Sequence, residues 1–367
     1  MKLYIQNNLD NQETYIHYID NNKIEINKEL ISKEVNIDLN VVKFIYFSLG
    51  KLNSEIIILS NNLSLLVLNQ DNDKINVSLS VKEESNFGKV ETYILKDSKN
   101  LFFRENKEKR IHVLLPKDYN EDKKYGVILM FDAQNIFDKN KVGNYTELND
   151  PYGGWQIEAS LLMLRDKYIV VGIENADIYR SIELTPSTKM GKFKDILLSL
   201  NEEELLKGEL DYFGDFINET VFPFIHEKYN IDLNEVGIVG SSCGGLASFY
   251  LGLRDYLKYK FIFTFTPATG FIEDETLEKF YDKINFIENK DKLPYIFYYQ
   301  GNKGDLEKLL FNVNQNFVPL LIKKGYPNNK IESYIEETAE HNEIMWRYGF
   351  NYAIKKYMDY KEKKDGR

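Results

Sequence analysis

The feature that most constrains the fold is the heptapeptide V-G-S-S-C-G-G at residues 239–245. A β-branched run precedes it and a helical pattern follows, so it reads as a sharp strand-to-helix turn of the form G-x-S-x-G with Ser242 in the middle. Side chains two residues before and two after the serine would crowd it, and Gly240 and Gly244 relieve that crowding. The turn predicts Ser242 as an exposed nucleophile above a sheet.

The neighbours of Ser242 fit lesser roles. If Ser241 were the central serine of the motif, the residues two before and two after it would be Val239 and Cys243. Neither is a glycine that relieves the crowding, so we expect Ser241 to have a structural role. Cys243 is the only cysteine, which excludes intrachain disulfides and cysteine-based zinc sites and fits a reducing, cytoplasmic setting. We expect the Cys243 side chain to be a small buried hydrophobic group and its backbone amide to face the developing oxyanion.

A serine nucleophile needs a base, and the chain has four histidines. His17 lies in the N-terminal region and His112 in a strand, so both fit structural roles. His226 precedes a glutamate but lacks the second histidine of H-E-x-x-H, which leaves a metalloprotease unsupported. His341 follows a late strand and precedes a helix, as this type of fold places its base, so it is the predicted general base.

The acid that orients the base should follow the strand at 295–299. Asp305 is the predicted triad acid, although an aspartate there also suits the N-cap of a helix beginning at residue 306. Glu307 is the alternative candidate for the triad acid. The resulting chain order of serine, acid and histidine is the order expected for an α/β-hydrolase.

The second oxyanion donor should lie just past an early central strand. The backbone amide of Ala133 or Gln134 would serve, and Asp132 fits a role in fixing this loop better than a role in chemistry. Tyr152 and Trp155 follow on a glycine-containing loop, where they would line the substrate pocket or serve as packing residues.

The chain changes character near residue 88. All eight prolines lie at or after Pro116, and only Gly50 and Gly88 of the 21 glycines fall in the first hundred residues. We therefore expect two domains, a small β-sandwich-like domain over 1–87 and a larger α/β domain over 88–367. The first would contain short strands at 14–19, 41–49, 55–59, 63–68 and 75–81.

The larger domain repeats a strand, loop and helix pattern, which predicts a mostly parallel sheet with helices on both faces. The expected strands are 111–115, 127–131, 168–173, 236–239, 261–266, 295–299 and 331–335. The expected helices are 155–164, 212–228, 245–257, 306–324 and 342–360. A helical insertion at 201–206, within the segment 174–214, would act as a lid.

Composition excludes several partners. A formal net charge of −10 argues against nucleic acid, whose binding relies on clustered Lys and Arg. No apolar run is long enough for a membrane-spanning helix, and the first residues are too polar for a signal peptide. The sequence leaves the oligomeric state open, a homodimer included.

Four segments carry a family resemblance: RIHVLLP at 110–116, FDAQNIFD at 131–138, RSIELTP at 180–186 and HNEIMWR at 341–347. Together they resemble the esterase family that includes enterochelin (siderophore) esterases, feruloyl and acetyl-xylan esterases, S-formylglutathione hydrolase and the mycolyltransferases. The resemblance covers residues 88–360. Ala133 stands where the family usually has glycine, and Gly304-Asp305 replaces its usual acidic pair.

Membership would imply a carboxylic ester hydrolase acting through an acyl-enzyme, with no metal or cofactor required. The substrate would be a small-molecule or carbohydrate-linked ester, such as a siderophore ester, and Arg180 would contact it. Two alternatives stay open. One is an acyltransferase of the same fold, and the other is a non-catalytic relative that binds its ligand through the N-terminal domain.

Overall fold

The computed structural model describes most of residues 2–81, then 89–101, 107–137, 167–188 and 208–364, with residues 154, 155, 157 and 160 between them. The chain forms two compact units, Met1–Asn86 and Phe87–Arg367, and each is described by itself. The boundary drawn from the sequence lies between residues 87 and 88.

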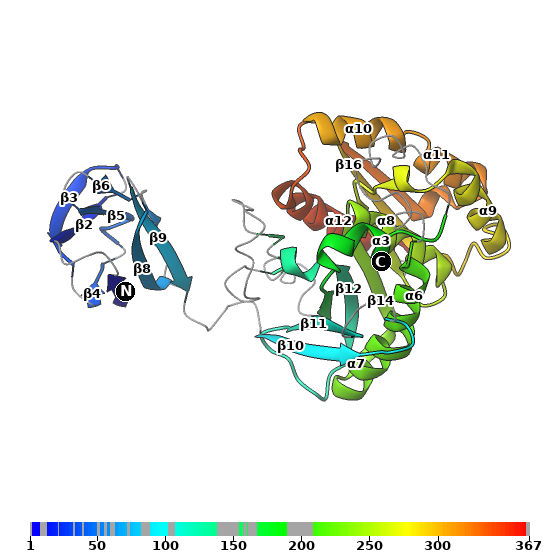
Figure 1. Ribbon diagram of the computed structural model, residues 1–367, viewed down its shortest axis with the longest axis horizontal. Helices are drawn as coiled ribbons and strands as arrows, with labels where there is room; N and C mark the ends of the chain where they lie inside the picture. Colours follow the sequence, from blue (N-terminus) through cyan, green and yellow to red (C-terminus); the bar gives the residue numbers. More distant parts are fainter. Residues whose placement is uncertain are drawn as a thin grey trace. The chain divides into compact units, whose positions relative to one another are not determined.

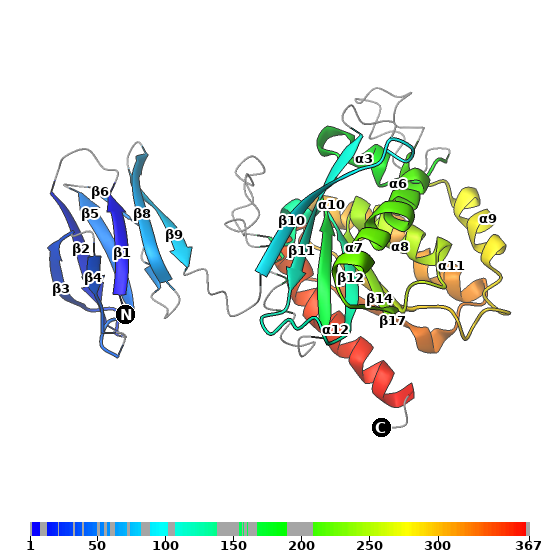
Figure 2. The same cartoon turned by 90° about the horizontal axis from the view of Figure 1, so that it is seen from below.

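The first unit contains two β-sheets, with strand orders β4-β1-β8-β9 and β3-β2-β5-β6, and β7 pairs with β5 (Figure 2). Strand β1 runs parallel to β8, and the remaining pairs are antiparallel. A single apolar cluster draws Ile5 and Leu68 from one sheet and Ile16 and Phe47 from the other, as in a sandwich. The strands are β1 (Lys2–Asn7), β2 (Thr14–Ile19), β3 (Glu25–Leu30), β4 (Glu34–Asn36), β5 (Phe44–Leu49), β6 (Leu52–Asn53), β7 (Ile57–Ile58), β8 (Leu63–Asp71) and β9 (Lys74–Val81).

The second unit is built on an eight-stranded sheet with the order β10-β11-β13-β12-β14-β15-β16-β17 (Figure 1). The pairs β10–β11 and β11–β13 are antiparallel and the other pairs are parallel. The carboxyl ends of the parallel strands therefore meet at one edge. The strands are β10 (Lys89–Lys96), β11 (Glu108–Leu115), β12 (Tyr125–Phe131), β13 (Tyr168–Ile173), β14 (Ile231–Ser241), β15 (Phe261–Phe265), β16 (Tyr295–Gly301) and β17 (Ile331–Glu336).

Helices cover both faces of this sheet, as predicted. One apolar cluster joins the sheet to α6 through α11, and a second joins the opposite face to α12 and Trp155. The helices are α3 (Arg180–Glu183), α6 (Leu210–Phe216), α7 (Phe222–Lys228), α8 (Cys243–Arg254), α9 (Asp274–Ile284), α10 (Asp305–Asn314), α11 (Phe317–Lys323) and α12 (Glu343–Lys364), with short 3₁₀ turns η1 (Ala133–Asn135), η4 (Asp177–Tyr179), η6 (Thr269–Phe271) and η7 (Asn328–Lys330).

Two predicted helices are interrupted where prolines fall. The helix expected at 306–324 is divided into α10 and α11, because in an uninterrupted helix the ring of Pro319 would clash with the carbonyl four residues earlier. The helix expected at 212–228 contains a π-helical turn, η5 (Ile217–Val221), just before Pro223. Pro223 and Pro319 are therefore the local sequence signals for the two interruptions.

Several elements were not predicted: β1, β3, β4 and β6 in the first unit, and β10, α3 and α9 in the second. β10 alternates exposed and more buried residues, so it lacks the continuous apolar run from which the central strands were predicted. α9 buries only Leu277, Tyr281 and Ile284. Of the helix expected at 155–164, only residues 157 and 160 are described as helical, and the lid segment 201–206 lies outside the described residues.

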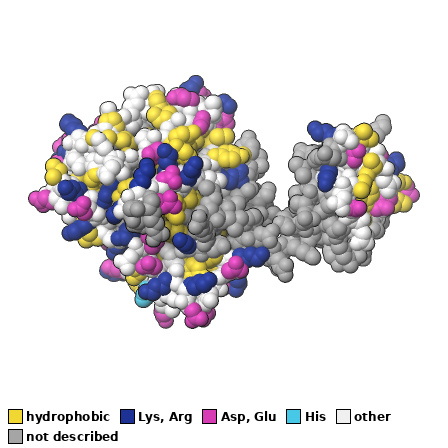
Figure 3. All heavy atoms as spheres, turned by 180° about the vertical axis from the view of Figure 1, so that it is seen from behind, with side chains coloured by type: hydrophobic (Ala, Val, Ile, Leu, Met, Phe, Trp, Pro, Cys, Tyr) yellow, Lys and Arg dark blue, Asp and Glu magenta, His cyan; other side chains and the backbone are white. Residues whose placement is uncertain are grey.

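The surface drawn in Figure 3 intersperses acidic and basic side chains among hydrophobic ones on the described part of the larger unit. No helix among the described residues is both long and apolar enough to cross a lipid bilayer.

Candidate active site

Ser242 lies on the turn between β14 and α8. Its φ of 56° and ψ of −122° place it in a backbone region that a residue with a side chain seldom adopts. The Ser242 amide donates to the Phe265 carbonyl at 2.9 Å, and its carbonyl accepts from the Ala268 amide at 3.0 Å. The strained residue is thus held from both sides by the chain around the end of β15.

The two flanking glycines are required by contact. A Cβ on Gly240 would lie 2.1 Å from the Gly244 carbonyl oxygen, and a Cβ on Gly244 would lie 2.6 Å from the Asp132 carboxylate. The first clash is backbone against backbone, so nothing flexible could move aside. Both glycines are thus needed, although their nearest contacts are with each other and with the segment at Asp132 and not with the serine that was expected to be crowded.

Cys243 is a buried core residue, as predicted. Burial raises the pKa of its thiol, which keeps it protonated. As the first residue of α8, Cys243 has a backbone amide with no partner inside the helix. That amide is free to face an oxyanion beside Ser242.

The second oxyanion segment is the 3₁₀ turn η1, directly after β12. Asp132, not Ala133, takes the left-handed conformation, with a φ of 58° and a ψ of 50°. Ala133 therefore occupies the position of the family's glycine without backbone strain, and its methyl is fully buried. The amides of Ala133 and Gln134 begin this turn, where intrahelical partners are lacking.

Asp132 fixes this turn through an ion pair, as predicted. Arg180 donates from Nε to Oδ1 at 2.6 Å and from Nη2 to Oδ2 at 2.8 Å, and Asn175 donates to Oδ1 at 2.7 Å. Burial alone lowers the pKa of Arg180, but the charge of Asp132 outweighs it and raises the pKa. Both oxygens of the carboxylate are thereby bound by donors of the protein.

Arg180, which is predicted to contact substrate, binds groups of the protein in the structure, and its contact with substrate stays a prediction. Besides Asp132, its Nη2 reaches the Ser241 carbonyl at 3.4 Å. Arg180 therefore connects the oxyanion turn with the strand that carries the nucleophile.

The far end of the turn is tied to the helix that follows His341. Asn135 donates from Nδ2 to Glu343 Oε1 at 2.6 Å, and its carbonyl accepts from the Trp155 amide at 2.7 Å. Trp155 is buried and lies edge-on to Phe265, so it has the packing role that the sequence also allowed. Tyr152 lies outside the described residues.

His341 lies in the segment between β17 and α12, beside the fully buried Glu307. Its Nδ1 is 3.4 Å from Glu307 Oε1, and its ring meets Trp346 edge-on at 4.8 Å. The Nδ1 makes no hydrogen bond to the described residues at this separation. Catalytic hydrogen bonds are often long in the free enzyme and shorten with substrate bound.

Of the two candidate acids, the structure brings Glu307 beside His341, while the predicted Asp305 is exposed to solvent. Asp305 is the first residue of α10, so the alternative role as N-cap is wrong: the helix begins one residue earlier than expected and Gly304 is its N-cap. Glu307, two residues later, points into the protein and faces His341. Side chains two apart on a helix point in nearly opposite directions, so only one of the two can reach inward.

A buried polar network holds the Glu307 carboxylate. Thr266 donates from Oγ1 to Oε1 at 2.9 Å, and Gln300 donates from Nε2 to Oε2 at 3.1 Å. Asn314 donates to Gln300 Oε1 at 2.9 Å and to the Pro267 carbonyl at 2.8 Å. Both carboxylate oxygens therefore have a hydrogen-bond donor, which lets an ionised glutamate stay buried. No motif in the sequence marks Thr266 or Gln300 as part of this network.

The other histidines are engaged elsewhere or exposed. His17 lies between Glu25 and Ser48, and His112 lies between Thr92 and Glu174. His226 is exposed on α7. Among the described residues no three His, Cys, Asp or Glu side chains gather as metal ligands would.

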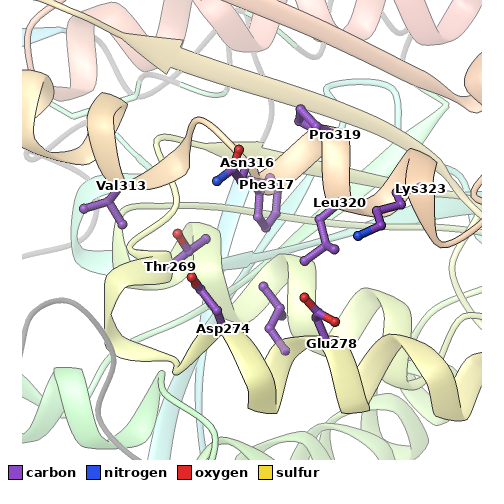
Figure 4. Close-up of a pocket in the computed structure, with 10 residues that line it drawn as sticks. Thr269, Asp274, Glu278, Val313, Asn316, Phe317, Pro319, Leu320 and Lys323 are labelled. Atoms are coloured by element: carbon purple, nitrogen blue, oxygen red, sulfur yellow. The ribbon is translucent and has the colours of Figure 1, made fainter.

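A separate cavity of about 280 Å³ lies between η6, α9 and the end of α10 with α11 (Figure 4). Apolar side chains such as Phe317 and Leu320 line it together with Asp274, Glu278 and Lys323. None of the predicted site residues lines this cavity.

The fold and this site together define an α/β-hydrolase. The model of the esterase family, described as "Putative esterase", matches residues 104–351. The chain belongs to that family, which confirms the resemblance found in its motifs, and it is a carboxylic ester hydrolase.

Solved structures share the fold at low sequence identity, and comparison with curated proteins gives no match. An IroE-like serine hydrolase from Shewanella oneidensis has a TM-score of 0.53 and 19% identity, over 72% of this chain and 79% of that one. A ferulic acid esterase from Anaeromyces mucronatus has a TM-score of 0.50 and 18% identity, over 75% and 92%. A siderophore hydrolase from Aspergillus nidulans has a TM-score of 0.50 and 16% identity, over 72% and 93%.

Proposed function

We propose that this esterase works through a triad of Ser242, His341 and Glu307 and an acyl-enzyme intermediate. The observation that carries the proposal is the strained Ser242 turn at the same sheet edge as the His341–Glu307 pair. The two are linked through β15: the Phe265 carbonyl accepts from the Ser242 amide, and the next residue donates to Glu307.

In the first half-reaction His341 takes the Ser242 proton while Oγ attacks the ester carbonyl carbon. The amides of Cys243 and of Ala133 or Gln134 hold the resulting oxyanion. The bond to the alcohol oxygen then breaks, and His341 returns the proton to the leaving alcohol. Water, deprotonated by His341, attacks the acyl-enzyme and releases the acid and free Ser242.

Glu307 would hold His341 in the tautomer with a proton on Nδ1 and stabilise the imidazolium that forms during each step. For the substrate we propose an ester of a siderophore or of an aromatic acid linked to carbohydrate. The similar structures support this class, because a ferulic acid esterase and a siderophore hydrolase are among them.

Hydrolysis of p-nitrophenyl acetate and butyrate tests the chemistry. Wild type should turn over both esters, Ser242→Ala should fall to background, and the matched control Ser241→Ala should keep most of the activity because only its backbone carbonyl is used. Equal rates for wild type and Ser242→Ala would remove the proposed mechanism. A panel of feruloyl, acetyl-xylan and catecholate-trilactone esters then identifies the substrate.

A further inference from the structure

Thr266 has an unusual backbone conformation for its residue type. Its φ is 41°, and it is the only β-branched side chain among the described non-glycine residues with positive φ. A branched Cβ raises the conformational free energy of a backbone with positive φ. Such strain persists only where the surrounding structure enforces it. Thr266 is also fully buried.

The strained backbone turns the Thr266 hydroxyl toward the proposed triad acid. Its Oγ1 donates to Glu307 Oε1 at 2.9 Å, and this same oxygen lies 3.4 Å from His341 Nδ1. Gln300 binds the other carboxylate oxygen. The hydrogen bonds from Thr266 and Gln300 therefore determine which oxygen of the Glu307 carboxylate faces the imidazole.

The backbone around Thr266 also holds the nucleophile. Phe265 and Ala268, on either side of it, hydrogen-bond the Ser242 amide and carbonyl, and the Thr266 amide itself donates to the Tyr299 carbonyl at 2.7 Å. One residue thus joins the chain that supports Ser242 to the carboxylate that supports His341.

We propose that Thr266 is a positioning residue, whose hydroxyl fixes the rotation of the Glu307 carboxylate relative to His341 and so aligns the triad acid with the nucleophile turn. The inference rests on the proposed triad. It assigns Thr266 no contact with substrate, so the effect of losing the hydroxyl should fall on kcat and leave KM unchanged.

The test compares Thr266→Val, which removes the hydroxyl at constant shape, with Thr266→Ser, which keeps it. Thr266→Val should lower kcat for p-nitrophenyl butyrate on the order of tenfold, the factor that one hydrogen bond to a charged group is worth. Thr266→Ser should stay near wild type. Thr266→Gly removes the hydroxyl and also the strain, so it replaces the valine variant if that protein does not fold.

A double variant distinguishes an effect of Thr266 on Glu307 from a loss of activity through unrelated changes in the structure. If Thr266 acts through Glu307, adding Thr266→Val to Glu307→Gln should change kcat little further, because the two losses are not independent. Additive losses, or a folded Thr266→Val with wild-type kcat, would overturn the inference alone. If the wild-type rate does not depend on Ser242, the proposed function and this inference both fail.

Discussion

The Glu307 carboxylate lies 3.4 Å from Nδ1 of His341, although the two side chains come from different elements and differ in burial. Glu307 is inaccessible within the first turn of α10, whereas the His341 side chain keeps 17% of its surface exposed. A buried acid behind a partly exposed imidazole is the arrangement a general base needs, since only the imidazole must reach substrate.

Replacement of Glu307 should therefore be far more damaging than replacement of Asp305. Glu307→Gln keeps the shape but cannot stabilise an imidazolium, so we expect kcat to fall by about 10³-fold or more. Asp305→Asn alters an exposed side chain and should leave kcat close to wild type. Steady-state hydrolysis of p-nitrophenyl butyrate by both variants checks this, and a large loss for Asp305→Asn would restore the original choice.

The contrast between these two residues marks what the sequence could predict. The turn at Ser242 follows from contacts a few residues apart, so the spacing of two glycines was sufficient. The acid depends on how α10 is rotated against the sheet, and Asp305 and Glu307 both suit a first helical turn. The role of Thr266 depends on its φ angle, which no local pattern in the sequence indicates.

Gly240→Ala should destabilise the protein, because the new Cβ would lie 2.1 Å from a backbone oxygen of Gly244. We expect a loss of about 2–3 kcal/mol in the free energy of unfolding, as for other forced overpacking. Gly172→Ala on β13 is the milder comparison, since its Cβ would meet only side-chain atoms, the nearest at 3.1 Å. Urea denaturation measures the free energy of unfolding of both variants. Equal values would contradict the expected clash at residue 240.

Arg180→Lys should lower activity although it preserves the charge. A lysine offers a point charge in place of the two parallel bonds to Asp132, and it cannot also reach the Ser241 carbonyl in the same geometry. The oxyanion turn would then be less firmly held, so we expect kcat to drop on the order of tenfold. Should KM rise while kcat stays constant, Arg180 would be a substrate contact after all.

The Cys243 thiol should resist modification in the native protein. It is buried and its pKa is raised by that burial, so thiolate is scarce at neutral pH. Ellman's reagent should react slowly with native protein and promptly with protein unfolded in guanidinium chloride. Rapid labelling of the folded enzyme would show that the start of α8 opens more readily than its packing implies.

The last prediction concerns acid stability, through Glu91 on β10. A hydrogen bond from Lys89 at 2.8 Å, with further ones from Tyr93 and from Tyr229 at 2.7 Å, lowers the pKa of Glu91 from 4.5 to about 2. Since the folded pKa is the lower one, the ionised carboxylate stabilises the fold above pH 4.5, and this contribution disappears as the pH falls toward 2. Glu91→Gln should therefore be less stable than wild type at pH 7, and the gap should narrow in acid. Urea denaturation of both proteins across this range measures the gap, and a gap independent of pH would mean that Glu91 stabilises the edge of the sheet without using its charge.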